Sequence, residues 1–381
     1  MKLIPPVAAI VLALASSNAA AKCTMRIDGD TLRIDGCNVQ ITNGTGSTKS
    51  VNGLGNLIIG YDTANTVDGF PSKKRGSHNL VVGDEHSYTS YGGVVTGFQN
   101  AVSAPSAGVF GGRLNRATGE FGTVAGGQYG LASGGGSIAA GGWNNAATGR
   151  FTAVTGGSNN TATDTATDDS QSPSYATVAG GFKNRADGIH ALVAGGALNT
   201  AHGLSATALG GQLNTASGAL ASVTGGEDNV ASGEAASISG GNDNEAAGPF
   251  ASITGGQANY AGGHASAVTG GYLNEAAGIY SSASAGEANT ASGQSAWASG
   301  GYFNHAQGKG ATVTGGRENR ADGQFSAVTG GVDNAATGQD SSVAGGGGNV
   351  ASGAAAAVSG GSLRTSAGTS DWSAGSLFQD F

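Results

Sequence analysis

The sequence repeats with a period of fifteen residues over most of its length. Its clearest copy, Gly210–Thr224, reads GGQLNTASGALASVT, and a Gly-Gly or Ala-Gly doublet recurs with its second glycine at every fifteenth residue from Gly181 to Gly361. Counted from the first residue of the doublet, position 5 is Asn, position 7 is Ala and position 9 is Gly. The position-5 residues are Asn184, Asn199, Asn214, Asn229, Asn244, Asn259, Asn274, Asn289, Asn304, Asn319, Asn334 and Asn349. A unit this short cannot bury its own apolar face, so neighbouring copies must stack into a solenoid.

Within one copy, two short segments alternate small or apolar residues with polar ones. The first, N-x-A-x-G, covers positions 5 to 9, and the second, A-x-V-x-G-G, runs from position 12 into the next doublet. Alternation at period two is the pattern of a strand with one buried face. Glycines at positions 1, 2 and 9 are expected where the chain reverses, because glycine reaches positive φ at no steric cost. The sequence therefore predicts an all-β fold, a parallel β-roll or β-solenoid of fifteen-residue coils, with two short strands per coil.

Distinct segments flank and interrupt this array. Residues 1–21 combine Lys2, a short apolar stretch and a small-residue cleavage site, which predicts a secretory signal peptide. The other expected parts are a cysteine-containing cap at 22–50, longer apolar capping coils at 51–97, the repeat array at 98–368 with an inserted surface loop near 164–175, and an aromatic C-terminal cap at 369–381. We therefore expect a protein that is secreted or displayed on the outer surface of a bacterial cell, with no membrane span of its own.

Cys23 and Cys37 are the only cysteines, and they flank the alternating runs TMRID and TLRID. In an oxidising compartment such a close pair most simply forms one disulfide that closes a hairpin or the first coil. Asp28, Asp30 and Asp35 lie between them and could suggest a calcium loop, but Asp-Gly steps are ordinary turns. The sequence therefore predicts a disulfide here, and no metal site or cofactor.

The predicted core is thin. Inward positions hold Asn at 5, Ala at 7, Ala or Ser at 12 and Val or Ile at 14. Burial of such small side chains offsets only part of the entropy lost when fifteen residues become ordered. Two further contributions are expected: a ladder in which each position-5 Asn amide bonds to the copies above and below it, and lateral packing of several chains. We therefore expect a homo-oligomer.

The strand pattern A-x-A-x-G-x-x-S-V-A-x-G resembles the head repeat of trimeric autotransporter adhesins, the YadA-type head, over roughly Asn56 to Gly368. Proteins of that family build a left-handed parallel β-roll, three chains of which pack into an adhesive head on the cell surface. The resemblance implies a homotrimer that acts as an adhesive or structural rod. Its partners would then be a host or environmental surface, a matrix protein or a glycan.

A second resemblance is to plant β-roll ice-binding proteins, which use Asn-x-Val-x-Gly half-coils of seven or eight residues. Positions 13 and 15 carry many small hydroxyl residues, for instance Ser222 and Thr224, and a flat array of hydroxyls could order water. Leu192 and Trp297 interrupt these columns, and Ser and Thr are common on any exposed strand. An ice-binding protein and an inert spacer are therefore the two alternative functions.

Patterns typical of enzymes are absent from the sequence, and we predict no catalytic residue. The six histidines occupy different repeat positions, and no G-x-S-x-G or H-E-x-x-H motif occurs. His86, beside Asp84 and Glu85, forms the one local cluster, which we interpret as a surface loop. The basic run of residues 73–75 is interpreted as a solvated turn. A net charge of −8 argues against nucleic acid and anionic membrane surfaces as partners.

If the protein acts by recognition, its variable positions should do the binding, because the invariant ones are needed for the fold. These are positions 3, 4, 10 and 11, at the expected corners, which hold most charges of the repeats. Stacked corners would form ridges suited to broad contact with a polymer or a cell surface. The candidate surface-binding residues are Trp143, Phe151, Tyr272, Tyr280, Tyr302 and Phe303.

Overall fold

The computed structural model describes residues 23–67, 69–70, 72–164 and 174–374. These residues form strands, turns and loops, and none of them is helical. The chain divides into two compact units, Met1–Ile41 and Thr42–Phe381. The predicted signal peptide, most of the loop near 164–175 and the last residues of the predicted C-terminal cap lie outside the described residues.

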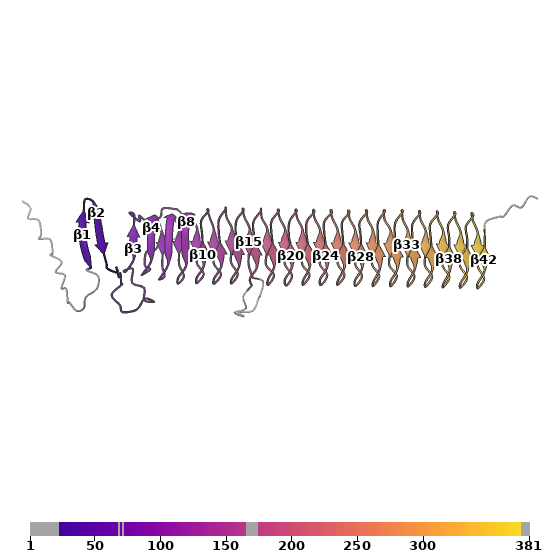
Figure 1. Cartoon of the computed structure of the whole chain (residues 1–381), viewed down its shortest axis with the longest axis horizontal. Coiled ribbons are helices and arrows are strands. Elements are labelled where there is room, and N and C mark those ends of the chain that lie inside the picture. Colours follow the sequence, from indigo (N-terminus) through magenta and orange to yellow (C-terminus); the bar gives the residue numbers. More distant parts are fainter. Residues whose placement is uncertain (1–22, 68, 71, 165–173, 375–381) are drawn as a thin grey trace, which may run out of the picture. The chain divides into compact units, whose positions relative to one another are not determined.

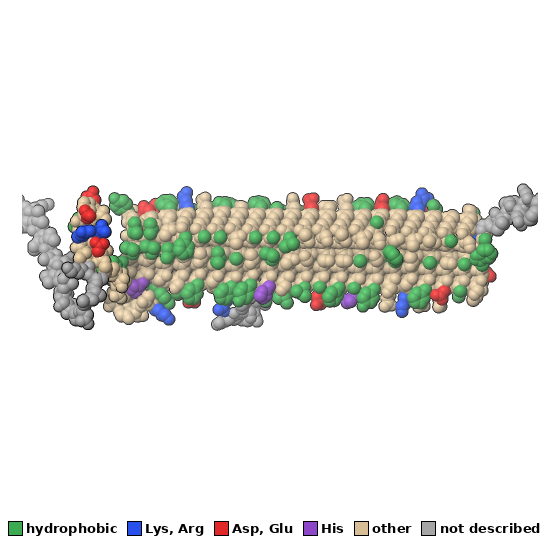
Figure 2. Space-filling view, in the orientation of Figure 1, with side chains coloured by type: hydrophobic (Ala, Val, Ile, Leu, Met, Phe, Trp, Pro, Cys, Tyr) green, Lys and Arg blue, Asp and Glu red, His purple; other side chains and the backbone are tan. Residues whose placement is uncertain are grey.

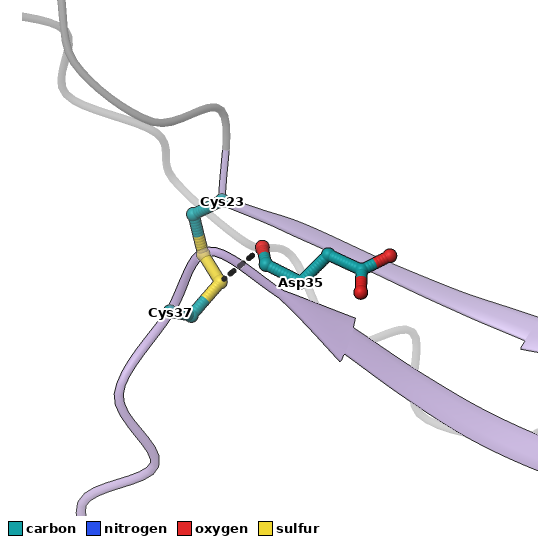
Figure 3. Close-up of a disulfide and its surroundings, with 3 residues drawn as sticks. All are labelled: Cys23, Asp35 and Cys37. Carbon is teal, nitrogen blue, oxygen red and sulfur yellow. Dashed lines mark hydrogen bonds between the residues drawn. A yellow bond between two sulfur atoms is a disulfide. The ribbon is translucent and has the colours of Figure 1, made fainter.

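The first unit contains one antiparallel hairpin. β1 (Thr24–Asp28) pairs with β2 (Thr31–Asp35). Cys23 and Cys37 stand at the open end of this hairpin and form a disulfide, in which the Cys37 Sγ lies 3.4 Å from the carbonyl oxygen of Asp35 (Figure 3). Every side chain of the two strands is exposed or half-buried. Because an isolated hairpin is marginally stable in water, the disulfide supplies stability that core packing does not.

The second unit is a parallel β-solenoid of about 19 turns with two strands per coil, as the repeat predicts (Figure 1). One sheet runs through β3 (Leu57–Ile59), β4 (Leu80–Asp84), β6 (Val94–Phe98) and β8 (Gly108–Arg113), then through the even-numbered two-residue strands at positions 13 and 14, from β10 (Thr123–Val124) to β42 (Trp372–Ser373). The other sheet consists of the odd-numbered two-residue strands at positions 6 and 7, from β5 (Ser87–Tyr88), β7 (Ala101–Val102) and β9 (Arg116–Ala117) to β41 (Thr365–Ser366).

The core of the solenoid is a stack of small side chains. In the coil 210–224 the residues at positions 5, 7, 12 and 14 are all 0% exposed, as predicted: Asn214, Ala216, Ala221 and Val223. Positions 6, 8, 13 and 15 alternate with them and face outward. The two sheets thus share one thin core, and each presents a separate outer surface.

The position-5 asparagines are buried and bonded to neighbouring coils. Asn244 Nδ2 donates to the Gly240 carbonyl of its own coil at 3.2 Å and to the Gly256 carbonyl of the next coil at 3.0 Å. Its Oδ1 accepts the backbone N–H of Asn259 at 3.0 Å. Amide-to-amide bonds, such as Asn244 Nδ2 to Asn229 Oδ1 at 3.0 Å, are also made from Asn214 through Asn334. The sequence suggested a ladder of amide-to-amide bonds alone. In the structure the asparagine side chains bond mainly to the backbone of their own coil and of the neighbouring coils.

The three glycine positions differ from the sequence expectation. Position 2 has positive φ, for example 90° at Gly226. Position 9 has no positive φ in the array, yet a Cβ at Gly233 would overlap the backbone of Gly248 in the next coil. Position 1 is open, since a Cβ at Gly225 would meet nothing within 4 Å. Positions 2 and 9 therefore require glycine, the first for its φ and both for close approach of the coils. At position 1 the φ is positive in some coils, such as 154° at Gly270, but not at Gly225.

Residues 42–50 belong to the solenoid unit. The backbone N–H of Asn43 donates to the His78 Nε2 at 3.1 Å, and Asn52 Nδ2 donates to the Asn43 carbonyl at 2.9 Å. The predicted 22–50 cap therefore spans both compact units, and its last residues cover the first coils. At the other end Trp372 lies in the last described strand, and its Nε1 donates to the Ser359 Oγ at 2.7 Å.

Asn244→Ala should weaken the solenoid by about 2–4 kcal/mol, because it removes the acceptor of the buried Asn259 N–H and one donor each from the Gly240 and Gly256 carbonyls. Guanidinium denaturation, together with hydrogen exchange of the Asn259 amide, would measure this. The control is Ser232→Ala, an exposed position-8 change in the preceding coil, which should shift stability by less than about 0.5 kcal/mol. Equal effects of the two changes would contradict a structural role for the ladder.

Gly226→Ala and Gly233→Ala should each destabilise the protein by roughly 3 kcal/mol or more, because the added methyl overlaps backbone that cannot move without separating two coils. Gly225→Ala should be tolerated, as the natural Ala285 is at the same repeat position. Thermal unfolding of the three variants side by side tests the ranking. A Gly225→Ala variant as unstable as the other two would refute it.

Candidate functional site

The corners of each coil are built by non-glycine residues with positive φ. Position 4 and position 11 adopt this conformation, for example Leu213 at φ 58° and Leu220 at φ 60°. It turns each backbone N–H toward the previous coil, where Leu213 donates to Ala197 at 3.0 Å and Leu220 donates to Leu204 at 2.7 Å. Leu114 is buried, but the side chains of both Leu213 and Leu220 are exposed and make no part of the core, so most corners can vary freely. We call the column of positions 3 and 4 ridge A and the column of positions 10 and 11 ridge B.

The six candidate aromatic residues are divided between these two ridges. All are 40–58% exposed. Ridge A carries Trp143, Tyr272, Tyr302 and Phe303, and ridge B carries Phe151 and Tyr280. In ridge A the Tyr302 and Phe303 rings meet edge-on with centroids 4.6 Å apart. The candidates therefore lie on two separate surfaces, at opposite corners of the coil.

Ridge B contains ring stacks with residues that are not among the six candidates. Phe151 stacks on Tyr175 with ring centroids 5.6 Å apart, and Tyr175 stacks on His190 at 5.2 Å. A second group, with neighbouring centroids 5.5 and 5.7 Å apart, contains Phe250, His264 and Tyr280. Tyr175, His190, Phe250 and His264 were not among the candidates. Their repeat positions could have identified them, because side chains at positions 10 and 11 of successive coils must be neighbours. Such stacks offer flat apolar faces in a row along the solenoid.

The two sheets have contrasting outer surfaces. The charged face, formed by positions 6 and 8 from Arg116 onward, holds seven ionisable Arg, Asp and Glu side chains: Arg116, Arg185, Asp187, Glu245, Glu275, Arg320 and Asp322. The flat face, formed by positions 13, 15 and 1 from Gly108 to Ala374, holds none of these residue types in its described coils. Figure 2 shows this face: blue and red side chains lie along its edges, and hydrophobic and uncharged ones lie between. Apart from Asp164, Arg364 and Asp371, the charged residues of these coils therefore lie on one face and the ridges.

His86 is a structural residue, and its interpretation as part of a surface loop is wrong. Its side chain is fully buried. Its Nδ1 accepts the backbone N–H of Asn100 at 3.2 Å and its Nε2 donates to the Val82 carbonyl at 3.1 Å. This arrangement requires the neutral imidazole, and burial lowers the pKa of His86 below its ordinary value. Both ring nitrogens are thus occupied by the fold.

An ionic cluster lies beneath the first coils. The buried Asp62 carboxylate lies 3.0 Å from the Lys74 Nζ and accepts the Tyr88 hydroxyl at 3.0 Å. Burial and the contact with Asp62 raise the pKa of the Tyr88 phenol far above its ordinary value. Hydrogen bonds from Thr63 lower the pKa of the half-buried Asp84. These groups fasten the insert between β3 and β4 to the solenoid, and all of their polar contacts are internal.

Among the described residues, no three His, Cys, Asp or Glu side chains are arranged to hold a metal ion. That part of the chain also has no helix long and apolar enough to cross a membrane. A scan against protein-family models and a search of curated proteins find no match to this sequence. Function must therefore be inferred from the flat face, the charged face and the two ridges.

The buried His86 predicts a pH-dependent N-terminal end. The unfolded state binds a proton on this residue below about pH 6.5, whereas the folded state does so only at lower pH. The contribution of neutral His86 to stability is therefore fully present above about pH 6.5 and should fall as the pH drops from 6.5 to 5.5. Hydrogen exchange of the Asn100 amide, which loses its acceptor when Nδ1 is protonated, would report this. His86→Gln should reduce the slope, whereas the uncharged core change Val95→Ala should lower stability and keep the slope. An unchanged slope in His86→Gln would contradict the assignment.

Proposed function

We propose that the protein is an exported bacterial rod in which several copies, most simply three, pack along their flat faces and expose their ridges for adhesion. The flat face is the observation that carries this proposal. From Gly108 to Ala374 it has 53 outward positions, and a chain with 11% charged residues would place about six charges there. The same coils put seven charges on the opposite face. Absence of charge is typical of surfaces that are buried against another protein.

The dimensions of the flat face agree with a stable interface. Coils spaced by about 4.8 Å give eighteen coils a length of roughly 85 Å, and a sheet surface about 10 Å wide then offers roughly 850 Å². Stable interfaces bury about 800 Å² on each partner. Most side chains at positions 1, 13 and 15 are small, so the backbones of two chains can approach closely. Trp297 is a large exception on this face, and its Nε1 donates to the Ser284 Oγ at 3.1 Å.

Adhesion is assigned to the ridges because they remain outside such an assembly. Exposed aromatic rings stack on sugar rings and apolar side chains, and a row of them allows many weak contacts to act together. The resemblance to trimeric adhesin heads supports the same arrangement. The predicted signal peptide supports export to the cell surface or the medium.

Light scattering on the mature protein tests the assembly. The expected mass is three times that of one chain. Ser237→Glu with Ser252→Glu, which puts two charges on the flat face, should yield monomers, and the matched control Ser217→Glu with Ser232→Glu on the charged face should leave the mass unchanged. A wild-type monomer at all concentrations would refute lateral packing and make ice binding or a spacer the function to examine.

Replacing ridge aromatics by serine tests adhesion separately. A variant with Tyr272→Ser, Tyr302→Ser and Phe303→Ser should keep its mass and lose at least tenfold in binding to collagen-coated or glycan-coated surfaces. Exposed aromatic residues contribute little to the stability of the fold, so folding should be preserved. Retained binding would show that ridge A is not the adhesive surface.

A further inference from the structure

We propose that a basic groove at the N-terminal end of the charged face binds the carboxylate or sulfate groups of an acidic polysaccharide. The groove has a volume of about 230 Å³ and is lined by Lys73, Arg75, Arg116 and the hydroxyl residues Thr89, Ser103 and Thr118, among others. No carboxylate lines it. This inference goes beyond the adhesive rod and does not depend on trimer formation or on the aromatic ridges.

The register of the coils brings the three cations together. Lys74 pairs in parallel with Tyr88, Tyr88 with Val102, and Val102 with Ala117. Residues 73 and 75, on either side of Lys74, therefore fall into the two columns that flank the buried column of Tyr88 and Val102. Lys73 stands in the column of Ser87, Ala101 and Arg116, and Arg75 stands in the column of Thr89, Ser103 and Thr118.

The basic run at residues 73–75 is thus divided by the fold. Lys74 turns inward and its Nζ pairs with Asp62 at 3.0 Å. Lys73 and Arg75 are exposed, and neither forms an ion pair with any described residue. The interpretation of the run as a solvated turn is therefore incomplete, because two of its three charges are aligned with Arg116 from a distant part of the sequence.

Arg116 can be compared with two arginines at the same repeat position. Arg185 pairs with Asp187 at 2.6 Å, and Arg320 pairs with Asp322 at 2.7 Å, in both cases with the residue at position 8 of the same coil. At Arg116 the corresponding residue is Thr118. The repeat thus supplies a carboxylate partner for arginine in two coils and a hydroxyl in the third, so the charge of Arg116 is left for an external anion.

The remaining features of the groove favour a polysaccharide. Its hydroxyl residues Thr89, Ser103 and Thr118 are in neighbouring coils, so donors recur about every 4.8 Å, close to the length of one sugar unit. Arg116 lies over the Phe70 ring, 5.9 Å from its centroid, which orients the guanidinium. A protein of net charge −8 repels densely charged polyanions. A polysaccharide with about one anionic group per sugar is repelled less and can still bind to the three cations of the groove.

Calorimetric titration of the wild-type protein with trigalacturonate, a sulfated galactan oligosaccharide and neutral maltotriose tests this. We expect binding of at least one acidic oligosaccharide, no binding of maltotriose, and loss of affinity as salt rises. Comparing the affinities for trigalacturonate and for the sulfated oligosaccharide shows whether carboxylate or sulfate is the preferred group. Equal competition by inorganic sulfate at the same concentration would overturn the polysaccharide assignment, and equal binding of maltotriose would overturn the role of charge.

Two variants and a matched control locate the site. Arg116→Gln should weaken binding at least tenfold. Thr118→Asp, which recreates the pair that Arg185 makes with Asp187, should do the same without removing any cation. Arg185→Gln should leave affinity unchanged. Wild-type affinity in Thr118→Asp, or an equal loss in Arg185→Gln, would overturn the proposal, and unchanged circular dichroism of each variant would show that the fold is intact.

Discussion

The hydrogen bonds between successive coils are the interaction on which the whole solenoid depends. Each coil is bonded to its neighbours along two sheets and at both corners, and the buried asparagines join the same backbones from inside. Such close stacking is possible only because positions 2 and 9 lack a side chain, as at Gly226 and Gly233. Stability therefore accumulates along the axis, and the thin core of Ala and Val side chains is sufficient to exclude water between the sheets.

Positions 5, 7, 12 and 14 and the glycine at position 9 are buried, which leaves ten of the fifteen positions outside the core, and the protein uses them unequally. Charge is excluded from the flat face, paired on most of the charged face, and variable along the ridges. A surface without charge suits lateral contact with further copies, whereas aromatic stacks such as that of Phe151 and Tyr175 suit contact with an external polymer. The groove at Arg116 adds a different chemistry at one end, because its cations lack the partners found elsewhere on the same face.

Much of the fold could be predicted because the repeat is visible within short stretches of the sequence. Strand positions, the buried columns and the Asn ladder all follow from counting residues, and the structure has them where counting places them. The corner conformation could not be predicted in this way. Bulky residues such as Leu220 adopt positive φ there because the N–H must reach the previous coil, and this demand outweighs the residue's own preference.

The sequence by itself determined the solenoid, its period and its core, because a fifteen-residue repeat permits only one register between neighbouring coils. It did not determine what the irregular N-terminal coils do, because inserts of unequal length leave their register undefined. Only the tertiary structure decided that His86 is buried, that Lys74 points toward Asp62, and that Lys73 and Arg75 align with Arg116. These placements come from pairing across coils, where hydrogen bonds between distant segments select the alignment that no local pattern specifies.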